Sequence, residues 1–224
     1  MKASEIKVIC FDYYGTLVDI GNPFGKIENW FSRFLGKEKS SISLQQFNTY
    51  FTKQRAKFFY NTHFYTGSEI LEKSYVNTCQ KFALKPYIDD FKIFASYLFT
   101  MPTAYDDAAK TISILKQKYK VCLVTNADNY ILWESIKTTG FNFDFIITSE
   151  YAQSNKPSAR IFEMTMKRAN ASSNQAVMVG DSLSEDIFGA QMLGINVIWI
   201  NRENKPCQKG VTEVKQIKEI LKLL

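Results

Sequence analysis

The chain has 224 residues, of which 46% are hydrophobic, so by length it can bury the core of one large domain or two small ones. Its four cysteines are widely spaced, and no stretch approaches the roughly 20 apolar residues of a membrane span. We therefore expect neither a structural zinc site nor a membrane partner. The formal net charge is +6, but no Lys/Arg run accompanies it, so no nucleic-acid partner is expected.

The N-terminal segment reads MKASEIKVICFD and predicts the first strand of the fold. Residues 6–11, IKVICF, are an apolar run of strand length, and a carboxylate, Asp12, follows directly. The segment contains neither a long apolar stretch nor a cleavage site. We therefore expect no signal peptide and predict a cytoplasmic location.

Residues 19–99 contain helical patterns and no convincing strand, which predicts a helical bundle. The pair Asn22–Pro23 is typical of a helix start. Capping boxes at residues 43–46 and 66–69 open two further helices, each followed by apolar residues at helical spacing. Another helix is predicted from residue 87 to residue 99.

Residues 100–224 alternate between apolar runs of strand length and amphipathic helical patterns. Such a pattern is typical of a parallel sheet covered on both faces. The predicted strands are 120–125, 143–148, 176–181 and 196–200, and the predicted helices are 105–118, 129–139, 158–169, 184–193 and 211–223. Residues 1–18 and 100–224 are thus predicted to form an α/β core with a doubly wound, Rossmann-like parallel sheet, into which residues 19–99 insert a helical-bundle cap.

Polar side chains gather where the predicted strands end. In an open parallel sheet, the carboxyl ends of the strands form the edge at which ligands bind. A single Asp after a strand is often a helix cap, but carboxylates, an amine, a hydroxyl and an amide at one edge together favour a catalytic site. These residues are Asp12, Thr125, Asn126, Lys156, Asp181 and Asp186.

Four short motifs follow one another along the chain: DYYGTL at 12–17, VTNAD at 124–128, NKP at 155–157 and GDSLSED at 180–186. In this order they resemble the motifs of the haloacid dehalogenase superfamily of hydrolases, and the resemblance covers the whole chain. It implies an α/β core with a smaller cap inserted after the first strand. It also implies that Asp12 is the nucleophile.

The carboxylates suggest an aspartyl-phosphate mechanism with bound Mg²⁺. Asp12 can attack phosphorus and form a covalent intermediate, but its charge repels a phosphate unless cations intervene. Mg²⁺ prefers oxygen ligands, and Asp12, Asp181 and the backbone carbonyl of Tyr14 are predicted to supply them. Asp186 is predicted to be a further ligand or to orient the metal-bound waters.

The other edge residues are predicted to contact the phosphate. Lys156 offers a compact positive charge to the nucleophile and to the phosphoryl oxygens. The Thr125 hydroxyl and the backbone amide of Asn126 are predicted to donate hydrogen bonds to the phosphate. Thr16 is predicted to contact the intermediate.

Tyr14 departs from the phosphatase pattern. Most phosphatases of the superfamily have Asp at this position, where it serves as acid and base, whereas tyrosine, with a pKa of about 10, is a poor base at pH 7. A Tyr here is typical of the 2-haloacid dehalogenases, which displace halide with the aspartate and need no metal. Metal-independent dehalogenation by Asp12 is therefore one alternative, and a non-catalytic phospho-ligand binding protein is another.

The fourth motif favours the phosphatase. The dehalogenases replace its first acid, whereas this chain keeps both Asp181 and Asp186. Clustered carboxylates without a cation are electrostatically costly. We therefore predict a Mg²⁺-dependent hydrolase of small phosphorylated metabolites whose catalytic residues are Asp12, Tyr14, Thr125 and Lys156.

The predicted cap carries the positive charge. Residues 21–85 hold more Lys and Arg than Glu and contain no Asp, which suits an anionic substrate. Arg55, Lys57 and His63 are the predicted substrate contacts in this segment, in addition to Thr16 and Asn126 in the core. The expected partner is a small anionic molecule, and we expect a monomer or a homodimer.

Overall fold

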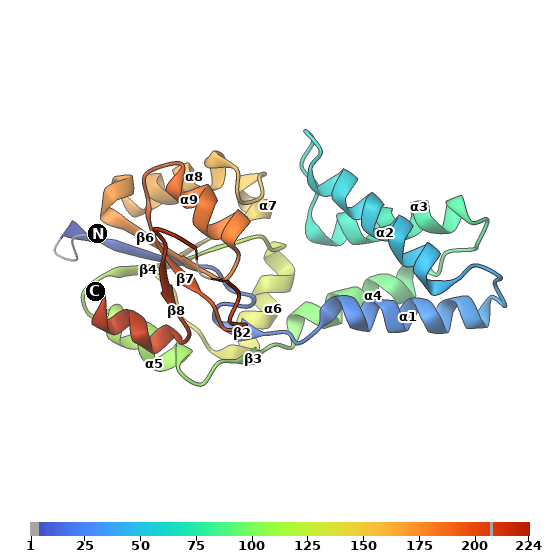
Figure 1. Ribbon diagram of the computed structural model, residues 1–224, viewed down its shortest axis with the longest axis horizontal. Coiled ribbons are helices and arrows are strands. Elements are labelled where there is room, and N and C mark those ends of the chain that lie inside the picture. The colour runs from blue at the N-terminus through green and yellow to red at the C-terminus, as the bar shows by residue number, and fades with distance from the viewer. Residues whose placement is uncertain (1–4, 207) are drawn as a thin grey trace.

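The computed structural model describes residues 5–206 and 208–224 and has an α/β core beside a helical bundle (Figure 1). Six parallel strands among these residues form one sheet, in the order β5-β4-β1-β6-β7-β8. They are β1 (Val8–Phe11), β4 (Lys120–Thr125), β5 (Phe145–Thr148), β6 (Ala176–Gly180), β7 (Asn196–Ile200) and β8 (Thr212–Val214). All five predicted strands are confirmed, and β1 lies in the middle of the sheet.

Helices cover both faces of this sheet, which confirms the predicted doubly wound fold (Figure 1). Successive side chains of β1 point to opposite faces. Ile9 and Phe11 therefore pack in one hydrophobic cluster, and Val8 and Cys10 pack in the other. The first cluster includes residues of α5 (Ala108–Leu115), α6 (Asn129–Thr139) and the 3-10 helix η4 (Ile217–Lys222), and the second includes residues of α7 (Ser149–Ala152), α8 (Ala159–Ala169) and α9 (Gly189–Gln191).

The helical bundle lies to one side of the sheet (Figure 1). Its helices are α1 (Pro23–Lys37), α2 (Leu44–Phe59), α3 (Gly67–Lys81) and α4 (Ile88–Thr100). They bury aromatic rings such as Phe31 and Phe91, whose centroids are 5.8 Å apart. The capping boxes at Ser43 and Thr66 are both formed, as predicted. The division of the chain into a core and a cap at the predicted boundaries stays a prediction.

A short antiparallel ribbon connects the sheet to the bundle. Strand β2 (Val18–Asp19) leads out of the core, and β3 (Thr103–Ala104) leads back into it. Val18 pairs with Ala104, and Asp19 pairs with Thr103. The chain therefore leaves and re-enters the core at adjacent positions.

The predicted helix over residues 211–223 is wrong in its first part. Residues 212–214 instead form β8, which pairs with β7 at the edge of the sheet, and η4 follows. Val214, Ile217 and Ile220 are buried at a spacing of three, which suits a strand end followed by a 3-10 helix. Pairing with the open edge of β7 outweighs the local helical pattern.

The predicted helix over residues 184–193 is irregular. It forms a π-helical turn, η3 (Leu183–Phe188), which is followed by α9. At the start of η3 the backbone N–H of Ser182 donates to Oδ2 of Asp186 at 3.0 Å. A separate 3-10 turn, η2 (Ser173–Gln175), precedes β6. Within the described residues, every helix is too short or too polar to cross a membrane.

Candidate active site

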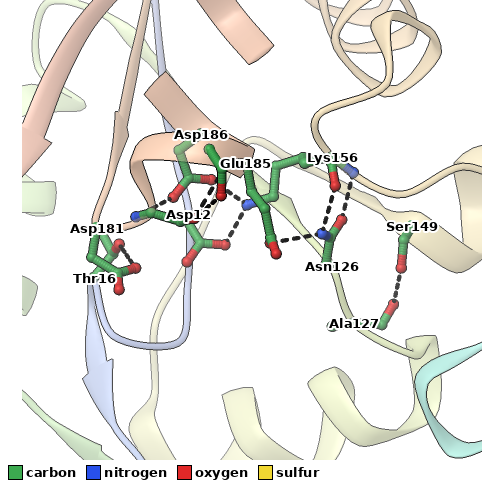
Figure 2. A network of polar contacts seen from close by, with 11 residues as sticks. Asp12, Thr16, Asn126, Ala127, Ser149, Lys156, Asp181, Glu185 and Asp186 are labelled. Carbon is green, nitrogen blue, oxygen red and sulfur yellow. Dashed lines mark hydrogen bonds and ion pairs between the residues drawn. The ribbon is translucent and has the colours of Figure 1, made fainter. Parts of the chain in front are cut away.

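The carboxyl edge of the sheet brings the predicted polar residues together (Figure 2). Asp12 follows β1, Thr125 ends β4 and Asp181 follows β6, and these three strands are neighbours. Asp12 is 7% exposed and Lys156 is 1% exposed. These two side chains are therefore nearly closed to solvent, whereas Asp181 is only partly buried.

Lys156 precedes α8 and places its ammonium group between two carboxylates (Figure 2). The Nζ atom lies 2.6 Å from Oδ1 of Asp12 and 2.6 Å from Oδ1 of Asp186. Burial alone would lower the pKa of Lys156, but the Asp12 and Asp186 carboxylates hold it above its usual value. The ammonium therefore stays charged beside the predicted nucleophile.

Asp181 is held close to the turn that follows β1. The Thr16 hydroxyl donates to Oδ1 of Asp181 at 3.1 Å, and the Trp199 indole N–H donates to the Asp181 backbone carbonyl at 2.9 Å. Gly15 has a φ of +84°, and a Cβ at this position would lie 2.6 Å from Oδ2 of Asp181. This turn therefore requires glycine for its backbone conformation and for its close approach to the carboxylate.

The carboxylates of Asp12, Asp181 and Asp186 converge. Each offers one oxygen, and these oxygens all lie within 4.8 Å of one another. Burial and then repulsion from Asp12 raise the pKa of Asp181 to about 6. Burial also raises the pKa of Asp186, although the Lys156 ammonium opposes the shift. One ammonium does not balance three carboxylates, so the cluster lacks positive charge.

This donor set fits Mg²⁺. The cluster offers carboxylate oxygens, which hard divalent cations prefer over softer ligands. A divalent cation bound among them would supply the missing positive charge and keep the carboxylates ionised. Asp12, Asp181 and Asp186 are the side chains that would hold it, and the backbone carbonyl of Tyr14 stays a predicted ligand.

Asn126 joins the Lys156 loop to Glu185, a residue of the fourth motif for which the sequence predicted no role (Figure 2). Its Oδ1 accepts a hydrogen bond from the Lys156 backbone N–H at 2.7 Å, and its Nδ2 donates to the Lys156 carbonyl at 3.1 Å. The same Nδ2 donates to Oε2 of Glu185 at 2.9 Å, and burial raises the pKa of Glu185. Neighbouring residues on a regular helix face different directions, so a helical pattern does not predict that Glu185 and Asp186 both face this site.

Three of the predicted phosphate contacts lie at this edge. Thr125 is buried at the end of β4, and Thr16 is buried with its hydroxyl on Asp181. Asn126 belongs to the network around Lys156. Their contacts with a phosphate stay predictions.

The Tyr14 phenol is directed to the helical bundle. Its hydroxyl donates to the backbone carbonyl of Phe99 at 3.0 Å, and its ring lies edge-on to the Phe99 ring at 5.8 Å. Burial raises the pKa of Tyr14 above its usual value, so even less of the phenolate that could act as a base is present near neutral pH, and the phenol is also a weaker acid. Within the described residues the phenol forms no hydrogen bond with Asp12, so its predicted catalytic role stays a prediction.

A cavity of about 910 Å³ lies between the bundle and the core. Tyr14 and Asn126 contribute to its wall from the core, and Arg55 contributes from α2. His63 is exposed beyond the end of α2, with its ring 4.7 Å from that of Tyr65, and does not belong to the described wall. Arg55 therefore lies in the cavity wall, and its contact with a substrate stays a prediction. Lys57 is exposed on α2 outside the described wall, and His63 does not reach the cavity because α2 has already ended at Phe59.

Asp128 connects the core to the bundle at the wall of this cavity. Its carboxylate accepts hydrogen bonds from the backbone N–H groups of Gly67 and Ser68, at 2.6 and 2.8 Å. These groups begin α3 and have no partner within the helix. The sequence motif contains Asp128, but the partners lie about 60 residues earlier in the chain, so the sequence did not predict the contact.

The fold and the site define a class of protein. It is a Rossmann-like α/β protein with an aspartate and a lysine at the carboxyl edge of its sheet and a helical bundle above that edge (Figures 1 and 2). A family model described as haloacid dehalogenase-like hydrolase matches residues 6–194. The chain belongs to this family of hydrolases, which confirms the resemblance of its motifs.

Individual relatives include phosphatases and dehalogenases. The glyceraldehyde 3-phosphate phosphatase of Methanothermobacter thermautotrophicus is 28% identical over 137 residues, which are 55% of this chain and only 61% of that protein. A crystal structure of a dehalogenase has a TM-score of 0.75 at 19% identity, with 100% of this chain and 99% of the other covered. The HAD phosphatase of Thermococcus onnurineus has a TM-score of 0.69 at 25% identity, with 97% of each chain covered.

Proposed function

We propose that the protein is a Mg²⁺-dependent phosphatase of small phosphorylated metabolites that acts through an aspartyl-phosphate on Asp12. The observation that carries the proposal is the convergence of Asp12, Asp181 and Asp186 within 4.8 Å. Buried like charges at this distance are unfavourable unless a cation lies among them. Relatives named as phosphatases support the same function.

Asp12 is the nucleophile in this proposal. Lys156 holds its Oδ1, and no residue in 5–206 or 208–224 donates a hydrogen bond to its Oδ2. A carboxylate oxygen attacks phosphorus while the bond from phosphorus to the leaving oxygen breaks, and solvent protonates that oxygen where it needs a proton. Water then attacks the aspartyl-phosphate, and phosphate and the Asp12 carboxylate are released.

Positive charge makes this attack possible. The Lys156 ammonium lies 2.6 Å from the nucleophile and reduces its repulsion of the phosphoryl oxygens. Asp12, Asp181 and Asp186 would hold a Mg²⁺ ion, which would supply further positive charge at this edge. Asn126 keeps Lys156 in place through two hydrogen bonds to its backbone.

The position of Tyr14 affects which leaving groups depart readily. The phenol is a weak acid, and its O–H donates a hydrogen bond to the Phe99 carbonyl, so in this proposal it does not replace the acid of other phosphatases. Leaving groups that depart without a proton, such as phenolates, are therefore favoured over alkoxides. Tyr14→Asp should raise the rate on alkyl phosphates relative to aryl phosphates, and equal relative rates in both proteins would contradict this explanation.

Metal-independent dehalogenation is the second candidate. Tyr14 is the observation that favours it, because halide leaves without a proton and needs no acid at this position. In that reaction Asp12 attacks the carbon that bears the halogen, and water hydrolyses the resulting ester. The convergent Asp181 and Asp186 favour the phosphatase, since this reaction has no use for a divalent cation.

One paired assay tests both candidates on the purified protein. Phosphate release from phenyl phosphate and chloride release from 2-chloropropionate are measured with Mg²⁺ and with a chelator. We expect phosphate release that the chelator abolishes. Chloride release that persists with the chelator would replace the proposal, and tight phosphate binding without either activity would favour a binding protein.

A further inference from the structure

The wall of the cavity between the bundle and the core contains a cation, Arg55, without an anionic partner among the described residues. Arg55 contributes to the cavity wall, and its guanidinium carbon lies 4.1 Å from the centroid of the Phe24 ring. The Nε atom is buried and has no acceptor. Within residues 5–206 and 208–224 the Arg55 guanidinium forms neither a hydrogen bond nor an ion pair.

The acidic residues around the cavity are engaged elsewhere. Asp128 accepts from the N-terminus of α3, and the backbone N–H of Asn129 donates to Glu150 at 2.6 Å. The remaining acidic side chains of the described wall form the ion pairs Glu72–Lys92 at 2.9 Å and Glu134–Lys137 at 2.7 Å. No carboxylate of the described wall therefore neutralises Arg55.

A guanidinium in this position is suited to bind an anion. Its N–H donors lie in one plane and match the geometry of a carboxylate or a phosphate. The Phe24 ring lies near the Arg55 guanidinium carbon, and burial lowers the Arg55 pKa because the charge has lost water. An anion that entered the cavity would restore both the lost hydrogen bonds and the lost charge balance.

The rest of the wall suits an apolar or aromatic body. Phe24, Phe59 and Phe91 contribute to it from the bundle, and Tyr14 and Tyr130 contribute from the core. Aromatic side chains favour stacked or edge-on contact with planar rings. The volume of about 910 Å³ lies within the range of pockets for small-molecule ligands.

We propose that the substrate is a phosphomonoester with a second anionic group, a carboxylate or a phosphate, on an apolar body, and that Arg55 binds this second group. The inference rests on the proposed phosphatase function, because it assigns the transferred phosphate to the Asp12 edge. The same cavity wall contains Tyr14 and Asn126 at that edge and Arg55 on α2. Arg55 is thus a residue that determines specificity and takes no part in the bond changes.

The test compares aryl phosphates with and without a second anion. Phenyl phosphate is the reference, 4-carboxyphenyl phosphate and 4-(2-carboxyethyl)phenyl phosphate carry a carboxylate at two distances, and 1,4-phenylene bisphosphate carries a second phosphate. The variants are Arg55→Met, Arg55→Lys as a partial rescue of the charge, and Lys53→Met as a matched control. Lys53 is an exposed cation on the same helix and lies outside the described cavity wall.

We expect the wild type to have a KM at least about tenfold lower for a carboxylated or doubly phosphorylated ester than for phenyl phosphate, because charge-assisted bidentate pairs are strong. The ester with the lowest KM shows whether the second anion is a carboxylate or a phosphate. Arg55→Met should abolish the preference, so that the KM for the carboxylated or doubly phosphorylated ester rises to about that for phenyl phosphate. Arg55→Lys should restore part of the preference, and Lys53→Met should retain all of it.

Two results separate the inference from the proposed function. Equal KM values for all the esters in the wild type, or a preference that survives Arg55→Met, would overturn the role of Arg55 while the phosphatase stands. If the wild type released phosphate from none of the esters, the proposed phosphatase function would instead be overturned. Inhibition by 4-hydroxybenzoate and by phenol adds a binding measurement, and inhibition by 4-hydroxybenzoate that is no stronger than by phenol would also count against Arg55. Circular dichroism confirms that each variant is folded.

Discussion

At the carboxyl edge of the sheet, charged groups hold one another in place, whereas in the helical bundle aromatic rings do so. Lys156 bridges Asp12 and Asp186 at 2.6 Å each, and Thr16 fixes Asp181. In the bundle, the rings of Phe31 and Phe47 lie 4.8 Å apart. The position of each side chain at the edge is specific, because each charge requires a partner at one position. The bundle instead derives its stability from the apolar area that its rings bury.

This difference predicts how substitutions act. A change at the edge removes a charge on which its neighbours depend, so it should alter chemistry and metal binding. A change in the bundle leaves that network intact and should alter selectivity or stability. The contacts of Asp128 and Tyr14 join the two regions and should show both effects.

The largest effect is expected for Asp12→Asn. The amide cannot act as the nucleophile, so kcat/KM for phenyl phosphate should fall by about 10⁴-fold or more. The fold should persist, because the change removes one of three mutually repelling carboxylates. Steady-state kinetics and thermal unfolding by circular dichroism measure the two effects. Asp106→Asn, an exposed change in a turn, is the control, and an Asp12→Asn variant with its activity intact would remove the nucleophile from this site.

A smaller effect is expected for Asp181→Asn. The amide keeps an acceptor for Thr16 but loses the negative charge, so the Mg²⁺ concentration for half-maximal activity should rise roughly 10- to 100-fold. Titration of activity with Mg²⁺ measures the shift. Wild-type activity at high Mg²⁺ with an unchanged midpoint would show that Asp181 is no metal ligand.

The contact of Asp128 with α3 tests the connection between the two regions. Asp128→Ala leaves the N–H groups of Gly67 and Ser68 without their acceptor, so we expect a loss of about 1–2 kcal/mol in the free energy of unfolding. The bundle should also separate more readily from the core, which small-angle X-ray scattering detects as a larger radius of gyration. Asp128→Asn keeps a hydrogen-bond acceptor, so its stability and radius of gyration should lie between those of the wild type and Asp128→Ala. Unchanged stability and radius in Asp128→Ala would show that the contact does not hold the bundle.

The metal-free protein should lose stability relative to Asp181→Asn as the pH rises. The pKa of Asp181 is raised to about 6 in the folded state, so protonated Asp181 favours folding. This contribution is fully present below the unfolded pKa of about 4 and is lost as the pH rises through about 6. The difference in Tm between the two proteins, recorded with a chelator from pH 4 to pH 8, measures it. A pH-independent difference would contradict the raised pKa.

The smallest effect is expected for Tyr14→Phe. Phenylalanine keeps the ring contact with Phe99 but loses the hydroxyl that donates to the Phe99 carbonyl, which should cost about 1 kcal/mol of stability. Turnover of phenyl phosphate should stay within about threefold of wild type, because the phenol transfers no proton in the proposed reaction. Thermal unfolding and kinetics on the same variant separate the two roles. A fall of 100-fold in kcat with unchanged stability would restore Tyr14 as a catalytic acid or base.

The sheet and its edge were predictable because they depend on local patterns. Apolar runs gave the strands, and the residue after each strand gave Asp12 and Asp181. The contacts of Asp128 with α3 and of Tyr14 with Phe99 were not predictable, since each joins segments far apart in the chain. The geometry of η3 was hidden as well, because a regular helix and a π-helical turn have nearly the same sequence pattern.

The ribbon of β2 and β3 brings the two ends of the bundle segment together. Asp19 and Thr103 are paired across the ribbon, so their Cα atoms are roughly 5 Å apart. A two-residue hairpin turn spans such a gap and could replace residues 20–102 without shifting the register of any strand in the main sheet. A change in the length of this segment therefore need not displace the strands that position Asp12 and Asp181.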